Sequence, residues 1–278
     1  METKTPPADG RKMTYLKNYR PPAFTIPETE LELWLDADET RIRTRHRIRR
    51  QPHGEGPLQL HGESLQLDKV TLDGALLGPD DYTYDADGLT LPDVPDSFEL
   101  VIKNRIQPRT NTSLSGLYHS AGMLCTQCEA EGFRRITFGL DRPDVLTGYS
   151  VTLYADARQY PVLLCNGNLV ASGELDGGRH WTKWRDPFPK PSYLFAIVAG
   201  DLARIEDCYT TLGGKNVRLC FYAAQRDIGK CRYALGALQR AMRWDEEEYG
   251  REYDLDLYNV VAVADFNMGA MENKSLNI

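Results

Sequence analysis

The chain has 278 residues, of which 41% are hydrophobic and 26% are charged, and its net charge at pH 7 is −7. These values are typical of a soluble globular protein with one large domain or two ordinary ones. The negative charge argues against nucleic acid as a partner, and no apolar run approaches the ~20 residues that span a bilayer. Residues 1–11 are polar and lack the apolar core of a signal peptide, so we expect a flexible tail on a cytoplasmic protein.

Residues 12–200 predict an all-β domain, and their clearest hairpin lies at 30–50. Leucine and isoleucine alternate with polar, mostly charged residues on both sides of a polar turn. Alternation of period two indicates strands that bury one face and expose the other. On the exposed faces Glu30 and Glu32 would lie opposite arginines. We therefore interpret the arginine-rich strand as a solvated sheet face, not as a surface for nucleic acid.

Further short strands follow, separated by turn dipeptides such as Asp73-Gly74 and Asp87-Gly88. Closely spaced short strands of this kind are typical of a β-sandwich or barrel. The proline-rich residues 186–191 predict a break in the chain, and 193–198 predict one more buried strand. We place a domain boundary near Gly200.

The second unit, residues 201–278, differs in pattern. A hairpin is expected at 208–222, followed by an amphipathic helix at 227–248 that buries Leu235, Leu238 and Met242. Asp227 and Gly250 are the candidate caps of this helix, and its acidic run 245–248 is expected to be a solvated last turn. With a strand at 255–266, the order hairpin, helix, strand indicates the start of an α+β domain.

The most informative motif is Gly269-Ala270-Met271-Glu272-Asn273, which follows the last predicted strand. Its small residues leave the backbone open to close approach. The carboxylate of Glu272 is suited to bind a cation such as a free amine.

A second notable segment, residues 125–134, contains Gln127, Glu129 and Glu131 around the pair Cys125 and Cys128. A structural zinc site needs about four ligands, and no second cysteine pair exists, so the pair is weak evidence for a metal. We expect the six cysteines to be reduced. If a carboxylate of this segment met Glu272, the two would repel each other, and a cationic α-amino group would relieve that repulsion. Such a pairing predicts selectivity for a free peptide N-terminus.

The chain resembles the bacterial type of aminopeptidase N, a family of zinc metallo-aminopeptidases in the gluzincin group. The resemblance covers nearly the whole chain after the tail, and it is carried by residues 125–133, 140–145, 186–195, 253–256 and 267–274. It implies a mainly β, sandwich-like N-terminal domain at 12–200. The truncated, incomplete start of a thermolysin-like α+β catalytic domain would follow at 201–278.

The resemblance also implies roles for residues of both segments. Glu272 would bind the α-amino group of the substrate with Glu129 as its partner, and Gln127 would line the same pocket. Met268 would line the pocket for the first side chain of the substrate, where a flexible thioether accommodates varied shapes.

The remaining members of the motif complete the expected substrate-binding set. Backbone around Gly269 and Ala270 would align the peptide, and Met271 and Asn273 belong to the same set. Ser275 stands where the family often has glycine, so we expect a local effect on the backbone there.

The zinc site that the resemblance implies has the form His-Glu-x-x-His on a helix, with a further Glu ligand downstream. No histidine of this chain fits that pattern, and each is expected to be a surface or packing residue: His46, His53, His61, His119 and His180. We therefore expect zinc in a longer enzyme only. This chain should contain no metal ligand and no catalytic residue, and should not hydrolyse substrates alone.

Two functions follow as hypotheses. The favoured one is the N-terminal part of a zinc aminopeptidase that acts on peptides with a free N-terminus and is completed by a missing C-terminal portion. The alternative is an inactive, stand-alone β-rich binding or interaction module, derived from a split product or a gene remnant. A His-Glu-x-x-His motif encoded after Ile278 would favour the enzyme, and a stop codon there would favour the module.

Overall fold

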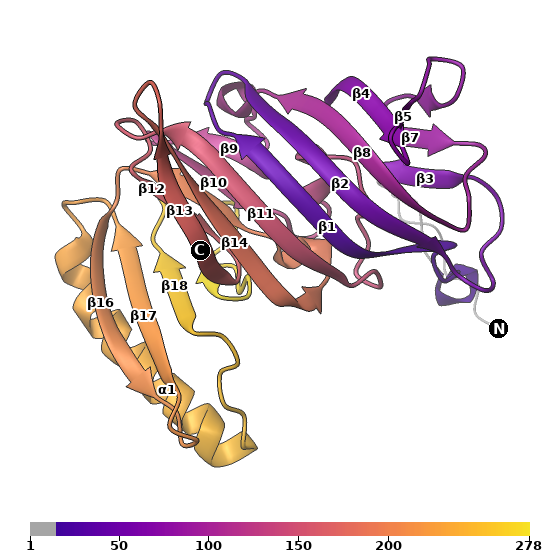
Figure 1. Ribbon diagram of the computed structural model, residues 1–278. Coiled ribbons are helices and arrows are strands. Elements are labelled where there is room, and N and C mark those ends of the chain that lie inside the picture. The colour runs from indigo at the N-terminus through magenta and orange to yellow at the C-terminus, as the bar shows by residue number, and fades with distance from the viewer. Residues whose placement is uncertain (1–14) are drawn as a thin grey trace, which may run out of the picture.

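Alternating hydrophobic residues build the largest sheet of the computed structural model, which describes residues 15–278. The tail predicted at 1–11 lies outside these residues. Eight strands hydrogen-bond side by side (Figure 1) in the order β13 (Asn168–Leu175), β14 (Arg179–Lys190), β11 (Thr147–Asp156), β1 (Phe24–Trp34), β2 (Thr40–Arg50), β8 (Ser97–Ile106), β4 (Gln66–Leu72) and β5 (Ala75–Leu76).

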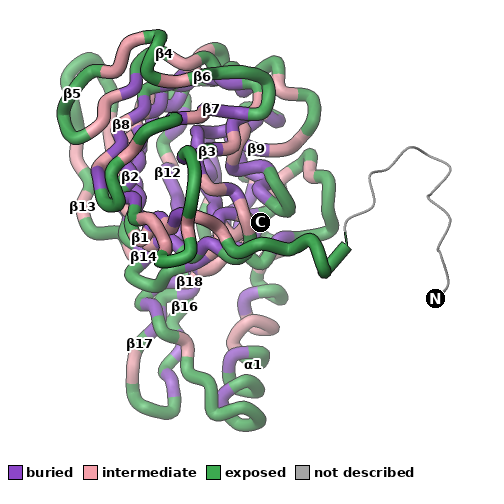
Figure 2. The backbone as a smooth tube through the Cα atoms, turned by 90° about the vertical axis from the view of Figure 1, so that its right-hand side faces the viewer, coloured by how far each residue is buried: buried purple, intermediate pink, exposed green. Residues whose placement is uncertain are grey.

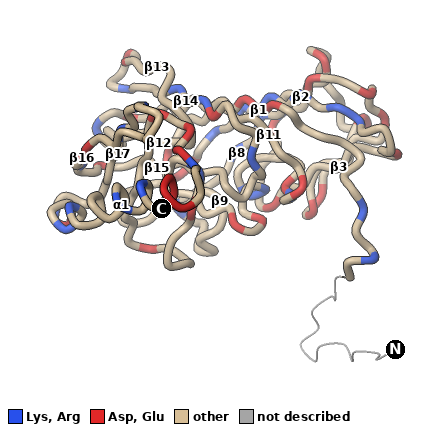
Figure 3. The backbone as a smooth tube through the Cα atoms, turned by 90° about the horizontal axis from the view of Figure 1, so that it is seen from below, with Lys and Arg blue, Asp and Glu red and all other residues tan. Residues whose placement is uncertain are grey.

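The predicted hairpin is confirmed as β1 and β2. Its antiparallel register sets Glu30 opposite Arg45 and Glu32 opposite Arg43. Arg43 forms an ion pair with Glu32 at 2.7 Å, and Arg45 with Glu30 at 3.5 Å. Acidic and basic positions are interspersed around this sheet in Figure 3. The arginines are therefore balanced by their neighbours, as expected for a solvated face.

The inner face of the large sheet packs against two smaller sheets. One has the order β12 (Val162–Cys165), β15 (Ile197–Gly200), β10 (Met123–Gln127) and β9 (Gly116–Ser120); the other is β3 (Leu58–His61), β7 (Gly88–Leu91) and β6 (Thr83–Tyr84). The core between them includes Leu33, Leu100 and Leu153, all fully buried. Figure 2 shows buried residues concentrated between these layers. The predicted sandwich-like β domain is confirmed.

The proline-rich stretch differs from its prediction. It does not break the chain but continues β14, and Lys190 still pairs with Thr147 of β11. Lys190 and Asp186 form a buried ion pair at 3.0 Å, and the Lys190 ammonium lies 4.4 Å from the ring centre of Tyr149. Proline is tolerated in extended backbone at a bulge, and this buried pair holds the segment against the sheet. The strand expected at 193–198 begins later, as β15, after a short 3-10 helix.

The second unit begins at β16 (Ala203–Thr210), and the predicted boundary near Gly200 stays a prediction. Antiparallel β16 and β17 (Asn216–Ala223) form the expected hairpin, and the parallel strands β18 (Leu257–Val261) and β19 (Leu276–Asn277) complete a four-stranded sheet. Helix α1 (Cys231–Tyr249) covers β16 and β17, away from the sandwich in Figure 1. Met242 is buried against this sheet and Leu235 is also buried, as predicted, whereas Leu238 is only partly buried.

Three local predictions in this unit are corrected. Asp227 does not cap α1, which follows the 3-10 helix Ile228–Lys230; its carboxylate pairs with Lys230 at 2.6 Å instead. Glu246 is not solvated, because the hydroxyl of Tyr209 donates to it at 2.7 Å in the interior. The last strand ends at Val261, since the chain then turns towards the β domain. Gly250, at φ +61°, is the C-cap as predicted.

The remaining short elements of the described chain are the 3-10 helices Leu16–Asn18, Pro108–Thr110, Phe133–Arg135 and Ser192–Leu194. Within residues 15–278, no helix combines the length and the apolar character that crossing a bilayer requires.

Candidate functional site

The candidate site is built on one end of the four-stranded sheet of the β domain. Gln127, the last residue of β10, pairs with Gly116 on one side. On the other side β10 pairs with β15 through Cys125 and Val198, so that Gln127 is level with Ala196. The amide of Ala196 donates to Oδ1 of Asn166 at 2.6 Å. Gly116, Gln127, Ala196 and Asn166 therefore form one row across the sheet, called here the Gln127 row.

The chain that leaves β18 is attached to β9 at one edge of this sheet. The hydroxyl of Tyr118 donates to the carbonyl oxygen of Asp265 at 2.8 Å, and the hydroxyl of Ser120 donates to its carboxylate at 2.6 Å. The side chain of Asn267 then donates to the carbonyl oxygen of Leu114, two residues before Gly116, at 3.0 Å. The chain thus runs along β9 towards the Gln127 row.

The same chain is attached at the opposite edge, next to β12. Nδ2 of Asn166 donates to the carbonyl oxygen of Lys274 at 2.7 Å, and the amide of Gly167 donates to Oγ of Ser275 at 2.6 Å. The ammonium of Lys274 also lies 2.8 Å from a carboxylate oxygen of Asp254 and 4.0 Å from the ring centre of Phe188.

Because β9 and β12 are the two edges of the sheet, the intervening residues have to cross the ends of β10 and β15. We call residues 268–273 the crossing segment. It contains the Gly-Ala-Met-Glu-Asn motif, so the fold brings this motif to the Gln127 row although more than a hundred residues separate them in sequence.

The predicted amine ligands differ in their surroundings. Gln127 is 1% exposed, and in the described residues neither its Oε1 nor its Nε2 has a hydrogen-bond partner. Glu129 is exposed in the turn after β10, where it precedes Ala130 through a cis peptide bond, and Glu272 is exposed in the crossing segment. Glu131 is engaged with Arg134 at 3.3 Å. Among residues 15–278, Glu131 therefore has an ion-pair partner and Glu129 has none.

No hydrogen bond or ion pair among residues 15–278 joins Gln127 or Glu129 to the crossing segment. Met268 is 55% exposed, and Gly269 and Ala270 are exposed beside it. Met271 and Asn273 are buried, and the backbone of Met271 exchanges two hydrogen bonds with Ile278. The outer part of the segment is thus open to a ligand, and the inner part attaches it to the protein. Substrate contact by each of these residues stays a prediction.

The cysteine pair lies below this site and has no free thiolate. Cys125, Cys128 and the neighbouring Cys165 are all buried. Burial raises the pKa of Cys125 to about 11 and that of Cys165 to about 12. Thiols with such values are protonated near neutral pH and are poor metal ligands. Across residues 15–278, no group of three or more His, Cys, Asp or Glu side chains is placed to hold a metal ion. The described residues therefore do not fit a zinc site.

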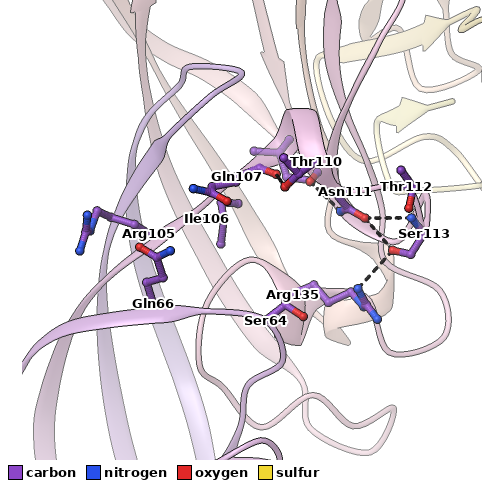
Figure 4. Close-up of a pocket in the computed structure, with 11 residues that line it drawn as sticks. Ser64, Gln66, Arg105, Ile106, Gln107, Thr110, Asn111, Thr112, Ser113 and Arg135 are labelled. Atoms are coloured by element: carbon purple, nitrogen blue, oxygen red, sulfur yellow. Dashed lines mark hydrogen bonds between the residues drawn. The ribbon is translucent and has the colours of Figure 1, made fainter.

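Two cavities of the described chain are lined by residues outside the crossing segment. One of about 300 Å³ lies between β8 and the 111–113 loop (Figure 4), and another of about 660 Å³ is lined in part by Val263 and Ala264. Arg105 and Arg135 line the first, but each already has a carboxylate partner, in Asp68 and Glu63. Its charge is thus largely neutralised. Neither cavity is lined by the predicted amine ligands, so a pocket shared by Glu129 and Glu272 stays a prediction.

Comparison with known families gives two matches along the chain. Residues 23–194 match the peptidase M1 N-terminal domain, and residues 233–278 match the peptidase family M1 domain. The chain belongs to peptidase family M1. Among relatives in this family, it is 51% identical to aminopeptidase N of Caulobacter vibrioides over 278 residues, which is 100% of this chain and 32% of that protein. Aminopeptidase N of Escherichia coli is 47% identical over 264 residues, covering 95% of this chain and 30% of that protein.

A solved structure of the family has the same fold. Aminopeptidase A of Legionella pneumophila, determined in complex with aspartic acid, superimposes with a TM-score of 0.91 at 32% identity. The match covers 95% of this chain and 31% of that one. The chain thus spans about a third of the length of the family members it matches.

Sequence patterns did not identify the residues that hold the crossing segment of this family M1 chain. Asn166 belongs to an Asn-Gly dipeptide, and Asp265 lies within the strand predicted at 255–266. An Asn-Gly dipeptide does mark a turn, but no local pattern indicates which distant carbonyl a turn side chain will reach. The contacts join residues 108 and 145 positions apart.

Proposed function

We propose that this chain supplies the amine-recognition part of an aminopeptidase that releases N-terminal amino acids from peptides. The main support is the course of the crossing segment, which is attached to both edges of one sheet and passes the Gln127 row. Membership of peptidase family M1, with relatives named aminopeptidase N, agrees with this function.

In this proposal Glu129 and Glu272 bind the substrate ammonium group together. Both carboxylates are exposed, and neither has an ion-pair partner among residues 15–278. A free α-amino group has a pKa near 8, so it is largely cationic at pH 7. Two carboxylates that share it gain charge-assisted hydrogen bonds and lose their mutual repulsion. An internal peptide nitrogen carries no charge, so the site would select the end of a chain.

The neighbouring residues would position the rest of the substrate. The buried amide of Gln127 has unused donors and an acceptor to offer a polar atom. The exposed thioether of Met268 would contact the first side chain, and it adapts to several shapes because it has three rotatable bonds. A side chain added at Gly269 would meet nothing within 4 Å, so the backbone there is open for a peptide to approach.

The zinc that hydrolyses the peptide would be held by residues outside this chain, in a C-terminal portion that acts as its partner. Bound there, zinc would supply Lewis-acid chemistry for activating water and polarising the scissile carbonyl. The residues of this chain bind and orient the substrate, and the chain alone does not hydrolyse it. A cytoplasmic location and peptide substrates are part of the same proposal.

Amine recognition is tested by titrating the isotope-labelled chain with leucinamide and, separately, with N-acetylleucinamide, followed by NMR. Leucinamide should shift the resonances of residues 268–273, and the acetylated compound should not. Glu272→Gln should weaken leucinamide binding roughly tenfold or more, because a charge-assisted contact is lost. Glu174→Gln, at an exposed glutamate of β13, is the matched control and should bind as wild type does. Equal binding of both compounds, or unchanged binding by Glu272→Gln, would refute amine recognition.

The absence of hydrolysis is tested separately with leucine p-nitroanilide and added zinc. No turnover above background is expected from this chain. Turnover well above background, whether or not a chelator removes it, would contradict the assignment of the catalytic groups to another portion.

A further inference from the structure

Ser275 has a backbone conformation that its side chain does not favour. Its φ is +62°, in the left-handed region that glycine adopts freely and other residues adopt at an energetic cost. The residue is 2% exposed, so its polar groups cannot be satisfied by bulk solvent. A buried polar residue in such a conformation needs compensating contacts.

The compensating contact is made to the β domain. The amide of Gly167 donates to the hydroxyl oxygen of Ser275 at 2.6 Å. Gly167, at φ +86°, lies so close to β14 that a Cβ atom there would be 2.3 Å from the carbonyl oxygen of Arg185. The turn is therefore held against β14, and its amide presents a donor at a fixed position.

Ser275 also faces its own half of the protein. Burial raises the pKa of Tyr253, and the Ser275 hydroxyl partly opposes that rise, which indicates that the two side chains are neighbours. The Tyr253 hydroxyl itself donates to the carbonyl oxygen of Leu257 at 3.0 Å, so the region around Ser275 extends to the start of β18. The neighbouring Lys274 is attached to the same turn through Asn166.

We propose that Ser275 is a positioning residue, whose hydroxyl couples the Gly167 turn to the crossing segment and thereby holds Glu272 at the end of β10. Glu272 lies only three residues before Ser275, so any movement of Ser275 is transmitted to it over a short length of chain. The hydrogen bond itself is independent of what the site binds, whereas the positioning role rests on the proposed function.

Two variants separate the hydroxyl from the backbone conformation. Ser275→Gly removes the hydroxyl and relieves the left-handed conformation, and Ser275→Ala removes the hydroxyl but keeps the unfavourable conformation. Ser172→Ala, at a β13 serine whose hydroxyl has no hydrogen bond in the described residues, is the control. The first readout is hydrogen exchange at the Gly167 amide, measured by NMR, with the amide of Ala196 as an internal reference.

Both Ser275 variants should speed exchange at Gly167 roughly tenfold, because one hydrogen bond is lost. Exchange at Ala196 should be unchanged, and Ser172→Ala should leave both amides as in wild type. If Ser275 only filled space, Ser275→Gly would leave the exchange rate of the Gly167 amide unchanged. Unchanged exchange at Gly167 in both Ser275 variants would overturn the coupling.

The second readout is the dissociation constant of leucinamide. Ser275→Gly should weaken binding at least threefold, although this variant has the less strained backbone. If wild type binds leucinamide and Ser275→Gly binds it equally well, the positioning role fails and amine recognition stands. If wild type does not bind leucinamide, the proposed function fails, and the positioning role with it, while Gly167 exchange still decides the coupling.

Discussion

Asn166 is the residue on which the attachment of the crossing segment depends most. It is 2% exposed, and its side chain makes three hydrogen bonds: Oδ1 accepts from the amide of Ala196 at 2.6 Å, and Nδ2 donates to the carbonyl oxygens of Leu194 at 3.1 Å and Lys274 at 2.7 Å. Asn166→Ala removes all three and leaves buried backbone groups without partners. At about 1–1.5 kcal/mol for each bond, the loss should be about 3–4 kcal/mol.

The assay is urea unfolding followed by tryptophan fluorescence. With a slope of about 2–3 kcal/mol per molar urea for a chain of this size, the midpoint should fall by about 1–2 M. Asn168→Ala is the matched control: this asparagine is two residues away, is half-buried, and bonds to Asp256 near the surface at 3.1 Å. It should lose less than about 1 kcal/mol. Equal midpoint shifts for the two variants would refute the reasoning.

A second variant tests donation specifically. Asn166→Asp keeps the shape and the acceptor but places a carboxylate next to two carbonyl oxygens. Its folded-state pKa should therefore be raised above the unfolded value of about 3.9. Below the unfolded-state pKa the introduced Asp is protonated in both states and costs little stability. As pH rises through its raised folded-state pKa, the variant loses stability relative to wild type. Equal destabilisation at pH 4 and pH 7 would contradict donation by Nδ2.

Three further predictions concern other buried groups. Burial lowers the pKa of His46 from 6.5 to about 4. The stability that the neutral imidazole provides is therefore present above pH 6.5 and is lost as pH falls through 4. In urea titrations, the free energy of unfolding of wild type should fall between pH 7 and pH 4 by about 3 kcal/mol more than that of His46→Gln. Gly167→Ala should destabilise by more than about 3 kcal/mol, because the added Cβ meets backbone, whereas Gly177→Ala, at φ +76° with nothing within 4 Å, should lose only about 1 kcal/mol; similar thermal midpoints would contradict this. Asp186→Asn should lose about 3–5 kcal/mol by leaving the Lys190 ammonium without its counter-charge, and adding Lys190→Met should restore part of that loss; no recovery in the double variant would show that charge burial is not the cause.

Local pattern predicted most of the β domain. Period-two alternation gave the hairpin of β1 and β2, including the arginines opposite Glu30 and Glu32. It failed at 186–191, because the extended backbone of proline is compatible with a strand edge and the Asp186–Lys190 pair is invisible in local sequence. The prediction that the acidic run 245–248 is solvated failed at Glu246 for a similar reason. The Tyr209 hydroxyl that donates to the buried Glu246 carboxylate comes from another element, β16.

The candidate site shows the same limit. The motif at 269–273 and the residues Gln127 and Glu129 were found from sequence and resemblance, but the contacts that bring the motif to the Gln127 row were not. Those contacts depend on sheet order, in which β9 and β12 are opposite edges. A chain that binds both edges must cross the strands between them, and strand order is not encoded in any short window of sequence.

The two attachments of the crossing segment also make its exact number of residues important. Asn267 and Lys274 are each hydrogen-bonded to the β domain, so the number of residues between them limits the positions that Glu272 can take. One inserted or deleted residue adds or removes about 3.3–3.6 Å of extended backbone, more than the length of a hydrogen bond. Substitutions in this stretch would therefore be accommodated more readily than a change in its residue count.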